Sequence, residues 1–330
     1  MKLIRNTLEK TWYQGHWLVR PLLPLTWLYC AIVTFRRFAY RMGIFRSVRF
    51  KVPVIVVGNI TVGGTGKTPL TIWLARFLAR SGYKPGIISR GYGGRAKKWP
   101  QQVRADADPW IVGDEAIVIA RHTDCPMAVG PERVADAQAI LNHSDCDILI
   151  SDDGLQHYAL ARSVEIVAID GHRRFGNGHC LPAGPLREPA RRAEKADFLV
   201  AKNVAGTGEY LMRYATGPLR KLTDASQSQP LEKFAQQRVH AVAAIANPGT
   251  FFAELRKAGL DIITHEFPDH HLFTAAELDF GDDLPVLMTE KDAVKCQRFA
   301  RDNFWYLPVE PELPEEFGIR LLNLLESRHG

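Results

Sequence analysis

Val52–Pro69 reads VPVIVVGNITVGGTGKTP, and this stretch determines how the rest of the chain is interpreted. Its first six residues, Val52–Val57, are apolar and predict a buried strand, while apolar residues at helical spacing after Pro69 predict a helix. Between strand and helix lies a glycine-rich turn, whose backbone amides are able to point toward phosphate oxygens. This order, with Lys and Thr where the helix begins, predicts a phosphate-binding P-loop.

The chemistry of a P-loop assigns a role to each part of the turn. Lys67 is expected to reach the β- and γ-phosphates of a nucleotide, and the Thr68 hydroxyl to ligate Mg²⁺. The general motif has glycine where this chain has Thr61, so Gly63 and Gly64 are expected to supply the flexibility instead. The predicted nucleotide-binding residues are Thr61, Val62, Gly63, Gly64, Thr65, Gly66, Lys67 and Thr68.

Two acids follow a second apolar run. Asp147–Ser151 (DILIS) predicts a strand that ends in Asp152 and Asp153. In P-loop proteins an acid at the end of such a strand holds Mg²⁺, and both side chains are able to reach the crevice beyond the strand ends. We therefore interpret Asp152 and Asp153 as metal-site acids, with a solvated turn as the alternative.

Further acids and histidines are candidates for proton transfer. Asp114 and Glu115 open a predicted helix in IVGDEA, where acids are common because of the helix dipole alone. A hydroxyl acceptor of phosphate needs a group that takes its proton, and Asp114 is a reasonable candidate. His270 and His271 are adjacent in FPDHHLF; taken without further information, such a pair is more often a surface feature than a catalytic one.

The positive charge of the chain is concentrated at its N-terminus. Residues 1–50 carry a net charge of +8, whereas the remaining residues sum to −2. The apolar run within this segment, Pro21–Phe35, is shorter than the ~20 residues of a transmembrane helix, and no signal-peptide cleavage site follows it. Either the run is an amphipathic helix packed on the core, or it lies in a membrane interface with arginines on lipid phosphates.

Aromatic residues favour the interfacial interpretation, because Trp and Tyr among basic residues are typical of membrane interfaces. They are Trp12, Trp17, Trp27, Tyr29 and Phe35. Nucleic acid is not an expected partner, since the apolar run would have no role in binding it. The five scattered cysteines contain no CxxC pair and suit a reducing compartment.

The order of strand-like and helical patterns predicts the fold class. We expect an α/β fold with a P-loop NTPase-like, mostly parallel sheet, helices on both of its faces, and a smaller C-terminal α/β unit. A polar stretch at 223–230 is the expected linker. The expected parts are a basic and apolar membrane-associating segment (1–50), a P-loop kinase core (51–225) and a smaller α/β domain (226–330).

Seven segments occur between Val52 and Lys295 in a characteristic order: VPVIVVGNITVGGTGKTP, IISRGYGG, VGDEA, SDDGLQH, LPAGPLREP, FPDHHLF and TEKDAVK. In this combination the chain resembles the tetraacyldisaccharide 4′-kinase family of lipid A biosynthesis, whose loop is itself GGTGKT without the early glycine. The resemblance implies ATP-dependent, Mg²⁺-dependent phosphorylation of the 4′-hydroxyl of a tetraacyldisaccharide 1-phosphate. It also implies a peripheral or monotopic protein at the cytoplasmic face of the inner membrane.

The resemblance also implies residue roles. Asp114 takes the role of acceptor for the 4′-hydroxyl proton, and His270, in preference to His271, that of its partner. Glu115 joins Asp152 and Asp153 among the acids of the metal and phosphate site. Contacts to phosphates or to the charged substrate are implied more weakly for two arginines, Arg90 and Arg187.

Two other functions are compatible with parts of the sequence. A membrane-associated P-loop ATPase or GTPase switch would hydrolyse nucleotide without a lipid acceptor, but it leaves LPAGPLREP and FPDHHLF without a role. A soluble small-molecule kinase leaves the basic N-terminus unexplained. The lipid kinase accounts for all of these segments.

Overall fold

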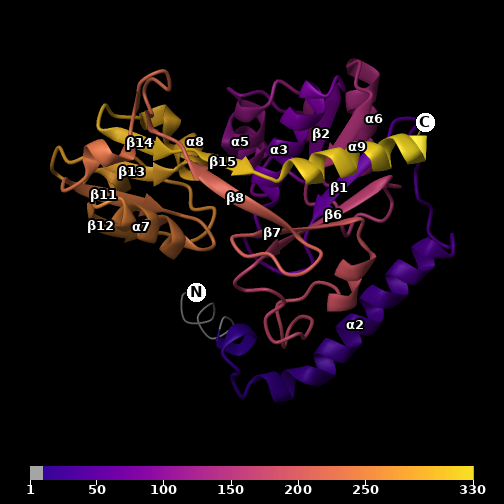
Figure 1. The fold of residues 1–330 in the computed structure, drawn as a ribbon. Coiled ribbons are helices and arrows are strands. Elements are labelled where there is room, and N and C mark those ends of the chain that lie inside the picture. Colours follow the sequence, from indigo (N-terminus) through magenta and orange to yellow (C-terminus); the bar gives the residue numbers. More distant parts are fainter. Residues whose placement is uncertain (1–9, 330) are drawn as a thin grey trace. The chain divides into compact units, whose positions relative to one another are not determined.

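The structure is a computed structural model and describes residues 10–329. The described chain divides into two compact units (Figure 1). The first takes the chain as far as Arg90, together with Cys125–Arg213 and the chain from Leu313 onward. The second takes Gly91–Asp124 and Tyr214–Glu312. The basic residues Lys2 and Arg5 and the acidic Glu9 of the N-terminal segment lie outside the described residues.

This division differs from the consecutive parts expected from the sequence. Gly91–Asp124, which was expected in the kinase core, belongs to the second unit. The chain from Leu313 onward returns to the first unit, where Phe317 packs against Trp73 with 5.4 Å between ring centroids. Sequence order cannot indicate such a return, because the burial of apolar faces depends on packing in space.

The first unit is built on a parallel sheet. Within this unit the strand order is β8-β7-β6-β1-β5-β2-β4, and all neighbouring pairs are parallel. The central strands are apolar and almost wholly buried, as expected for strands covered on both faces. The strands are β1 (Val54–Gly58), β2 (Pro85–Ser89), β4 (Met127–Val129), β5 (Ile148–Ser151), β6 (Val164–Asp170), β7 (Phe198–Lys202) and β8 (Tyr210–Thr216), which continues into the second unit.

Helices cover both faces of this sheet. The crossover from β1 to β2 and the crossover from β4 to β5 run in opposite directions along the sheet. Because such crossovers are right-handed, α3 and α6 lie on opposite faces. The expected α/β class with helices on both faces is therefore confirmed. The helical elements of the unit are α2 (Val19–Arg41), α3 (Lys67–Arg80), α6 (Arg133–His143), η1 (Ala190–Lys195) and α9 (Glu315–His329).

Helix α2 is mostly exposed. It buries only Thr26 and Ala39, and Pro24 lies inside it without ending it. The helix is held by hydrogen bonds to the loop before η1: the Thr26 hydroxyl donates to the carbonyl of Cys180 (3.3 Å) and accepts from the amide of Ala183 (3.0 Å). None of the helices in residues 10–329 combines the length and the apolarity that crossing a bilayer requires.

The second unit has its own six-stranded sheet, in the order β10-β9-β14-β13-β11-β12. The four strands from β14 to β12 are parallel, and β9 and β10 add antiparallel pairs at one edge. The strands of the unit are β9 (Leu219–Lys221), β10 (Ser228–Gln229), β11 (Arg238–Ala243), β12 (Asp261–Glu266), β13 (Val286–Thr289) and β14 (Phe304–Leu307), with two short ones outside this sheet, β3 (Gln101–Gln102) and β15 (Val309–Glu312).

Two apolar clusters form the core of the second unit. Phe251 and Leu255 of α7 (Pro248–Lys257) pack in one of them, and Ala293 and Cys296 of α8 (Glu290–Cys296) pack in the other. Helix α5 (Asp114–His122) packs on α8, which brings the segment Gly91–Asp124 into this unit. The remaining helical elements are α4 (Pro109–Val112), η2 (Leu231–Phe234), η3 (Ala276–Leu278) and η4 (Gln297–Phe299).

Candidate functional site

The glycine-rich turn of the first unit runs from the end of β1 to the start of α3. Gly63 (φ 118°) and Gly66 (φ 86°) adopt left-handed backbone conformations that favour glycine. Gly66 caps α3, so Lys67 is the first helical residue and Pro69 lies in the first turn, where its missing N–H is not needed. The turn thus presents a helix N-terminus, which favours negative charge.

The loop before η1 also holds the turn in place. The amide of Val62 donates to the carbonyl of Pro185 (2.8 Å), and Thr61 forms a β-bridge with Leu186. Thr61, the residue that replaces the early glycine of the general motif, is buried in this contact. The predicted nucleotide-binding residues therefore form one continuous stretch that runs from the turn after β1 into the first two residues of α3.

Lys67 faces the end of the neighbouring strand. Because β1 pairs with β5, the residues that follow these two strands lie close together. The Lys67 Nζ lies 3.4 Å from the Oδ1 of Asp153, and an Nη of Arg187 lies 3.4 Å from the same oxygen. Burial alone would raise the pKa of Asp153, but Lys67, Arg187 and Arg133 outweigh it and hold that pKa below its ordinary value.

Asp152 has a different environment from its neighbour. It is buried, and its two carboxylate oxygens accept hydrogen bonds from the hydroxyls of Thr71 and Ser89, both at 3.0 Å. Asp152 therefore ties α3 to the ends of β2 and β5. Arg90, which follows β2 in the chain, is exposed.

Several buried polar atoms around the turn lack a hydrogen-bond partner. They are the Thr65 hydroxyl, the Oδ1 of Asn59, the Ser151 hydroxyl, and two guanidinium nitrogens of Arg133. Buried polar groups are nearly always paired, so a set of unpaired ones beside a glycine turn indicates a place for a polar ligand. Arg133 was not singled out from the sequence, because an arginine in a helical pattern carries no distinguishing signal.

The donors near the turn suit a magnesium–nucleotide pair. Mg²⁺ is usually held by one or two carboxylates together with substrate phosphates and water, and Thr68, Asp152 and Asp153 supply hard oxygen donors of that kind. Within the part of the chain that the structure describes, no three His, Cys, Asp or Glu side chains gather into a metal site. Glu115, the fourth predicted metal ligand, lies in the second unit.

In the second unit, Asp114 begins helix α5. Gly113 precedes it with φ 93°, and a Cβ at Gly113 would lie 2.4 Å from the carbonyl oxygen of Tyr92, so only glycine fits there. Asp114 is 5% exposed, and its Oδ1 accepts a hydrogen bond from the amide of Glu115 (2.9 Å). A rigid turn therefore fixes this buried carboxylate.

His270 meets Asp114 from the loop after β12. Its Nδ1 lies 3.1 Å from both carboxylate oxygens of Asp114. Its backbone has φ 58°, a strained value for a residue other than glycine, and its ring lies 4.7 Å from that of Tyr92. His271 instead contacts Glu277 (2.9 Å). Of the two adjacent histidines, the structure thus brings His270 to Asp114.

Two lysines of α8 complete the cluster. The Lys291 Nζ lies 3.0 Å from Glu115, 3.5 Å from Asp269 and 3.2 Å from the Nε2 of His270. The Lys295 Nζ is buried 2.8 Å from Asp292 and 3.8 Å from Asp114. Neither lysine was assigned a role from the sequence. Their four-residue spacing on a predicted helix, which places them on one face, was the available signal.

These charges set the ionisation of the cluster. Burial alone would raise the pKa of Asp114, but Lys291, the hydrogen bond of His270 and Lys295 outweigh it and hold that pKa below its ordinary value. Burial opposes the charge of Lys291 as well, yet Glu115, Asp114 and Asp269 together raise its pKa. Asp114 is therefore an anion and Lys291 a cation at neutral pH.

Comparison with known proteins agrees with these features. A family model described as Tetraacyldisaccharide-1-P 4′-kinase (LpxK) matches residues 18–326. The chain is 53% identical to a tetraacyldisaccharide 4′-kinase of Nitrosococcus oceani over 96% of this chain and 93% of the relative. It is 48% identical to a protein of the same name from Methylobacillus flagellatus over 97% of each.

A solved structure extends the likeness to three dimensions. The crystal structure of LpxK from Aquifex aeolicus in complex with ATP matches with a TM-score of 0.80 and 27% identity, covering 95% of this chain and all of that one. The family match spans nearly the whole described chain, including both charged clusters. This chain therefore belongs to the tetraacyldisaccharide-1-P 4′-kinase family.

Proposed function

We propose that this protein transfers the γ-phosphoryl group of ATP to the 4′-hydroxyl of a tetraacyldisaccharide 1-phosphate in lipid A biosynthesis. Family membership supports the reaction, and the ATP named with the Aquifex aeolicus LpxK structure supports the nucleotide. The observation that carries the proposal is the buried Asp114 carboxylate held by His270. A nucleotide switch has no need of such a group, whereas an alcohol acceptor does.

The first unit holds the nucleotide. The turn from Thr61 to Thr68 surrounds the phosphates with backbone amides, and Lys67 neutralises the charge that develops on the transferred group. Arg187 and Arg133 add positive charge around Asp153. Arg90 remains a candidate for contact with the charged substrate.

Thr68, Asp152 and Asp153 would hold the magnesium ion that accompanies ATP. When bound, Mg²⁺ supplies positive charge to the phosphate oxygens. Glu115 stays a candidate acid for the same centre, although its carboxylate pairs with Lys291 in the structure. The protein's own contribution is to fix the donor oxygens: Asp152 is anchored by Thr71 and Ser89 before any ligand binds.

The contacts of His270 assign its tautomer. Lys291 donates toward the Nε2 of His270, so Nε2 is an acceptor and the ring proton lies on Nδ1. Nδ1–H then donates to the carboxylate of Asp114. His270 acts as a positioning residue that orients Asp114 for the acceptor hydroxyl.

The lowered pKa of Asp114 determines when this carboxylate can accept the proton of the hydroxyl. A weak base does not remove the proton of an alcohol in the ground state. In a loose phosphoryl-transfer transition state the hydroxyl becomes acidic only as the new bond forms. Asp114 therefore orients the 4′-hydroxyl through a hydrogen bond and receives its proton late in the step.

The N-terminal helix provides the contact with the membrane. Trp17, just before this helix, and Trp27 and Phe35 within it are each more than 60% exposed, and Arg41 lies in the last turn of the helix. Aromatic side chains among arginines suit the headgroup boundary of an anionic leaflet. We place the protein peripherally at the cytoplasmic face of the inner membrane, where its lipid acceptor lies.

A transfer assay tests this proposal. Purified protein is incubated with γ-labelled ATP, Mg²⁺ and a tetraacyldisaccharide 1-phosphate, and label in the lipid is compared for wild type, Lys67→Ala and Asp114→Ala. We expect label in the lipid for wild type only. Nucleotide hydrolysis without labelled lipid would contradict the kinase and favour a switch, and retained transfer in Asp114→Ala would remove its catalytic role.

A further inference from the structure

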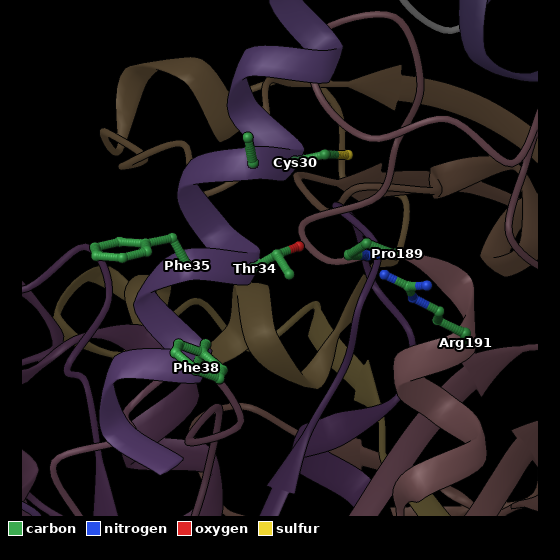
Figure 2. Close-up of a pocket in the computed structure, with 7 residues that line it drawn as sticks. Cys30, Thr34, Phe35, Phe38, Pro189 and Arg191 are labelled. Carbon is green, nitrogen blue, oxygen red and sulfur yellow. The ribbon is translucent and has the colours of Figure 1, made fainter. Parts of the chain in front are cut away.

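The structure contains two features that the nucleotide turn does not explain. One is a cavity of about 480 Å³ between α2 and the segment from Pro189 to Arg191 (Figure 2). Phe35 and Phe38 line this cavity, so it belongs to the exposed apolar surface of α2, which the membrane contact proposed above already accounts for. The other is Asp292 of the second unit, a buried carboxylate to which the proposed function gives no role.

Asp292 lies in the first turn of α8 and is fully buried. Its Oδ2 accepts hydrogen bonds from the hydroxyl of Thr289 (2.6 Å) and from the backbone amide of Ala244 (3.0 Å). Its Oδ1 lies 2.8 Å from the Nζ of Lys295, in an ion pair that lacks the alignment of a hydrogen bond. Both oxygens thus have partners inside the protein, as a buried charge requires. Asp292 is therefore placed to hold other groups of the protein, not a ligand.

A capping role alone does not account for these contacts. Thr289 and Asp292 have the spacing of a capping box, in which the acid bonds back to the amide of the capping residue. Thr289 does cap α8, because its hydroxyl accepts the amide of Asp292 (3.3 Å). The carboxylate of Asp292, however, accepts the amide of Ala244, which lies 48 residues away in the sequence and directly follows β11. Asp292 therefore ties α8 to the end of β11.

Ala244 connects Asp292 to His270. Ala244 is fully buried, and its carbonyl accepts the backbone amide of His270 (3.2 Å). His270 has φ 58°, a conformation that a residue other than glycine keeps only where its surroundings hold it. Without Asp292 the buried amide of Ala244 would lose its acceptor, and the backbone to which His270 is bonded would shift to find another. The strained conformation of His270 therefore depends on Asp292 through Ala244.

Lys295 fixes the orientation of Asp292. The Nζ of this buried lysine lies 2.8 Å from Asp292 but 3.8 Å from Asp114, which is beyond hydrogen-bond distance. The ring of Phe273 lies over the ammonium, with its centroid 5.1 Å from Nζ. Lys295 thus holds the Oδ1 of Asp292 and leaves its Oδ2 for Ala244.

We propose that Asp292 is a positioning residue for the Asp114–His270 pair and acts through the backbone of Ala244. The inference rests on the proposed kinase function and identifies what holds His270 in its strained conformation. The contacts run from the carboxylate of Asp292 to the amide of Ala244, from the carbonyl of Ala244 to the amide of His270, and from the ring of His270 to Asp114. The position of the acceptor oxygen of Asp292 therefore matters more than its negative charge.

Asp292→Asn and Asp292→Glu separate the position of the oxygen from the charge. Asparagine keeps an acceptor oxygen at the same place and loses the charge, whereas glutamate keeps the charge and moves the oxygens by one methylene. We expect kcat for lipid phosphorylation to fall about 10–10²-fold in Asp292→Glu and to stay within about 5-fold of wild type in Asp292→Asn. The KM for ATP should stay within about 2-fold of wild type in both. Equal kcat values in the two variants, or the reverse order, would overturn the inference.

A second pair of variants replaces this test if glutamate overpacks the buried site and prevents folding. Asp292→Asn/Lys295→Met and Asp292→Ala/Lys295→Met are both uncharged at these two positions, and only the first retains an acceptor oxygen for Ala244. We expect kcat to be about 10-fold lower in the variant with alanine than in the variant with asparagine. The same kcat in both would contradict the role of the oxygen.

The His270→Gln background distinguishes positioning from a general loss of stability. If Asp292 acts through His270, the effect of Asp292→Glu on kcat should shrink to less than about 3-fold when His270 is already replaced. The decrease in the urea midpoint should be similar in both backgrounds. Asp282→Glu is the matched control, because Asp282 also accepts from a side chain, His240 (3.1 Å), and from a backbone amide, that of Leu284 (3.1 Å); it should keep the wild-type kcat. A kcat loss of the same size in both backgrounds would mean that Asp292 does not act through His270.

Hydrogen exchange tests the conformation of His270 without any measurement of activity. We expect the segment 267–274, which contains the amide of His270, to take up deuterium about 10-fold faster in Asp292→Glu than in wild type, Asp292→Asn or Asp282→Glu. Equal uptake in all four proteins would overturn the inference, even if the wild type phosphorylates the lipid. Faster uptake in Asp292→Glu alone, in a protein whose wild type labels no lipid, would contradict the kinase function and still support the link from Asp292 to His270.

Discussion

Asp153 in the first unit and Asp114 in the second are both carboxylates whose pKa is held low by cations, but the cations are arranged differently. Those around Asp153 are Lys67, Arg187 and Arg133, and Arg133 has two nitrogens without a partner. Around Asp114 the two lysines of α8 are already shared with other acids: Glu115 and Asp269 for Lys291, and Asp292 for Lys295.

This difference indicates what each cluster receives. The first cluster has hydrogen-bond donors of Arg133 without a partner and lies at a helix N-terminus, and both features suit a polyanion such as a triphosphate. The second contains four acids, two lysines and one histidine, and each of its lysines has Nζ within 3.0 Å of a carboxylate oxygen. It presents a carboxylate, and a neutral hydroxyl is the ligand that a carboxylate can accept without charge repulsion.

The largest expected effects come from removing the central group of each cluster. Lys67→Ala and Asp114→Asn should each lower kcat for lipid phosphorylation by about 10²–10³-fold or more. Only Lys67→Ala should also weaken ATP binding, because Lys67 belongs to the proposed nucleotide turn whereas Asp114 is proposed to contact the acceptor hydroxyl. Calorimetric titration with Mg²⁺ and ATP measures the ATP affinity of each variant. An equal loss of ATP affinity in both variants would contradict the assignment of nucleotide binding to the first cluster and of the acceptor hydroxyl to the second.

The next effect distinguishes the adjacent histidines. His270→Gln should lower kcat by about 10²-fold, because Asp114 loses the donor that orients it. His271→Gln is the matched control: it removes a contact with Glu277 and should leave kcat within about 2-fold of wild type. The measurement is kcat for the two variants at steady state. Equal kcat values would contradict the role of His270 in positioning Asp114.

The first cluster was largely predictable from the sequence, and the second was not. The P-loop is one contiguous stretch whose function resides in its backbone, so VGGTGKT is informative by itself. The partners of Asp114 come from three segments up to 181 residues apart, and only the packing of α5 on α8 brings them together. The family resemblance supplied Asp114 and His270; it gave no role to Lys291, because a lysine in a helical pattern has no signature of its own.

Removing Lys291 should produce a smaller effect with a characteristic pH dependence. Lys291→Met should lower kcat about 10-fold at pH 7.5, since His270 and Glu115 lose a shared partner. Lys291 lowers the pKa of Asp114, so removing Lys291 raises that pKa. The acidic limb of the profile of kcat against pH should therefore move to higher pH.

Lys291→Arg keeps the charge and should restore the position of that limb. Lys257→Met, which removes an exposed lysine of α7, is the control for loss of charge in the second unit. Profiles of kcat against pH between 4.5 and 8.5 provide the measurement. An unchanged limb in Lys291→Met would show that this lysine does not act on Asp114.

The smallest expected effect concerns the stability of the first unit. His157 follows the Asp152–Asp153 pair, and burial, with Arg133 and Arg90, lowers its pKa from 6.5 to about 4. Between these two pH values His157 is protonated in the unfolded chain but neutral in the native protein. The contribution of His157 to the free energy of unfolding is therefore highest above pH 6.5 and decreases as the pH falls toward 4. After allowance for its partial exposure, the loss is about 2 kcal/mol.

Comparison with His157→Gln isolates this contribution. Asp136 titrates in an overlapping range with the opposite sign: burial raises its pKa to about 6, so its ionisation lowers stability as the pH rises. Wild type and variant share Asp136, and its effect cancels in their difference. Urea unfolding at pH 5 and pH 7.5 should therefore give a smaller drop in stability for His157→Gln than for wild type. Equal drops would mean that His157 is solvated, and that the Arg133 side of the nucleotide turn is more open than the structure describes.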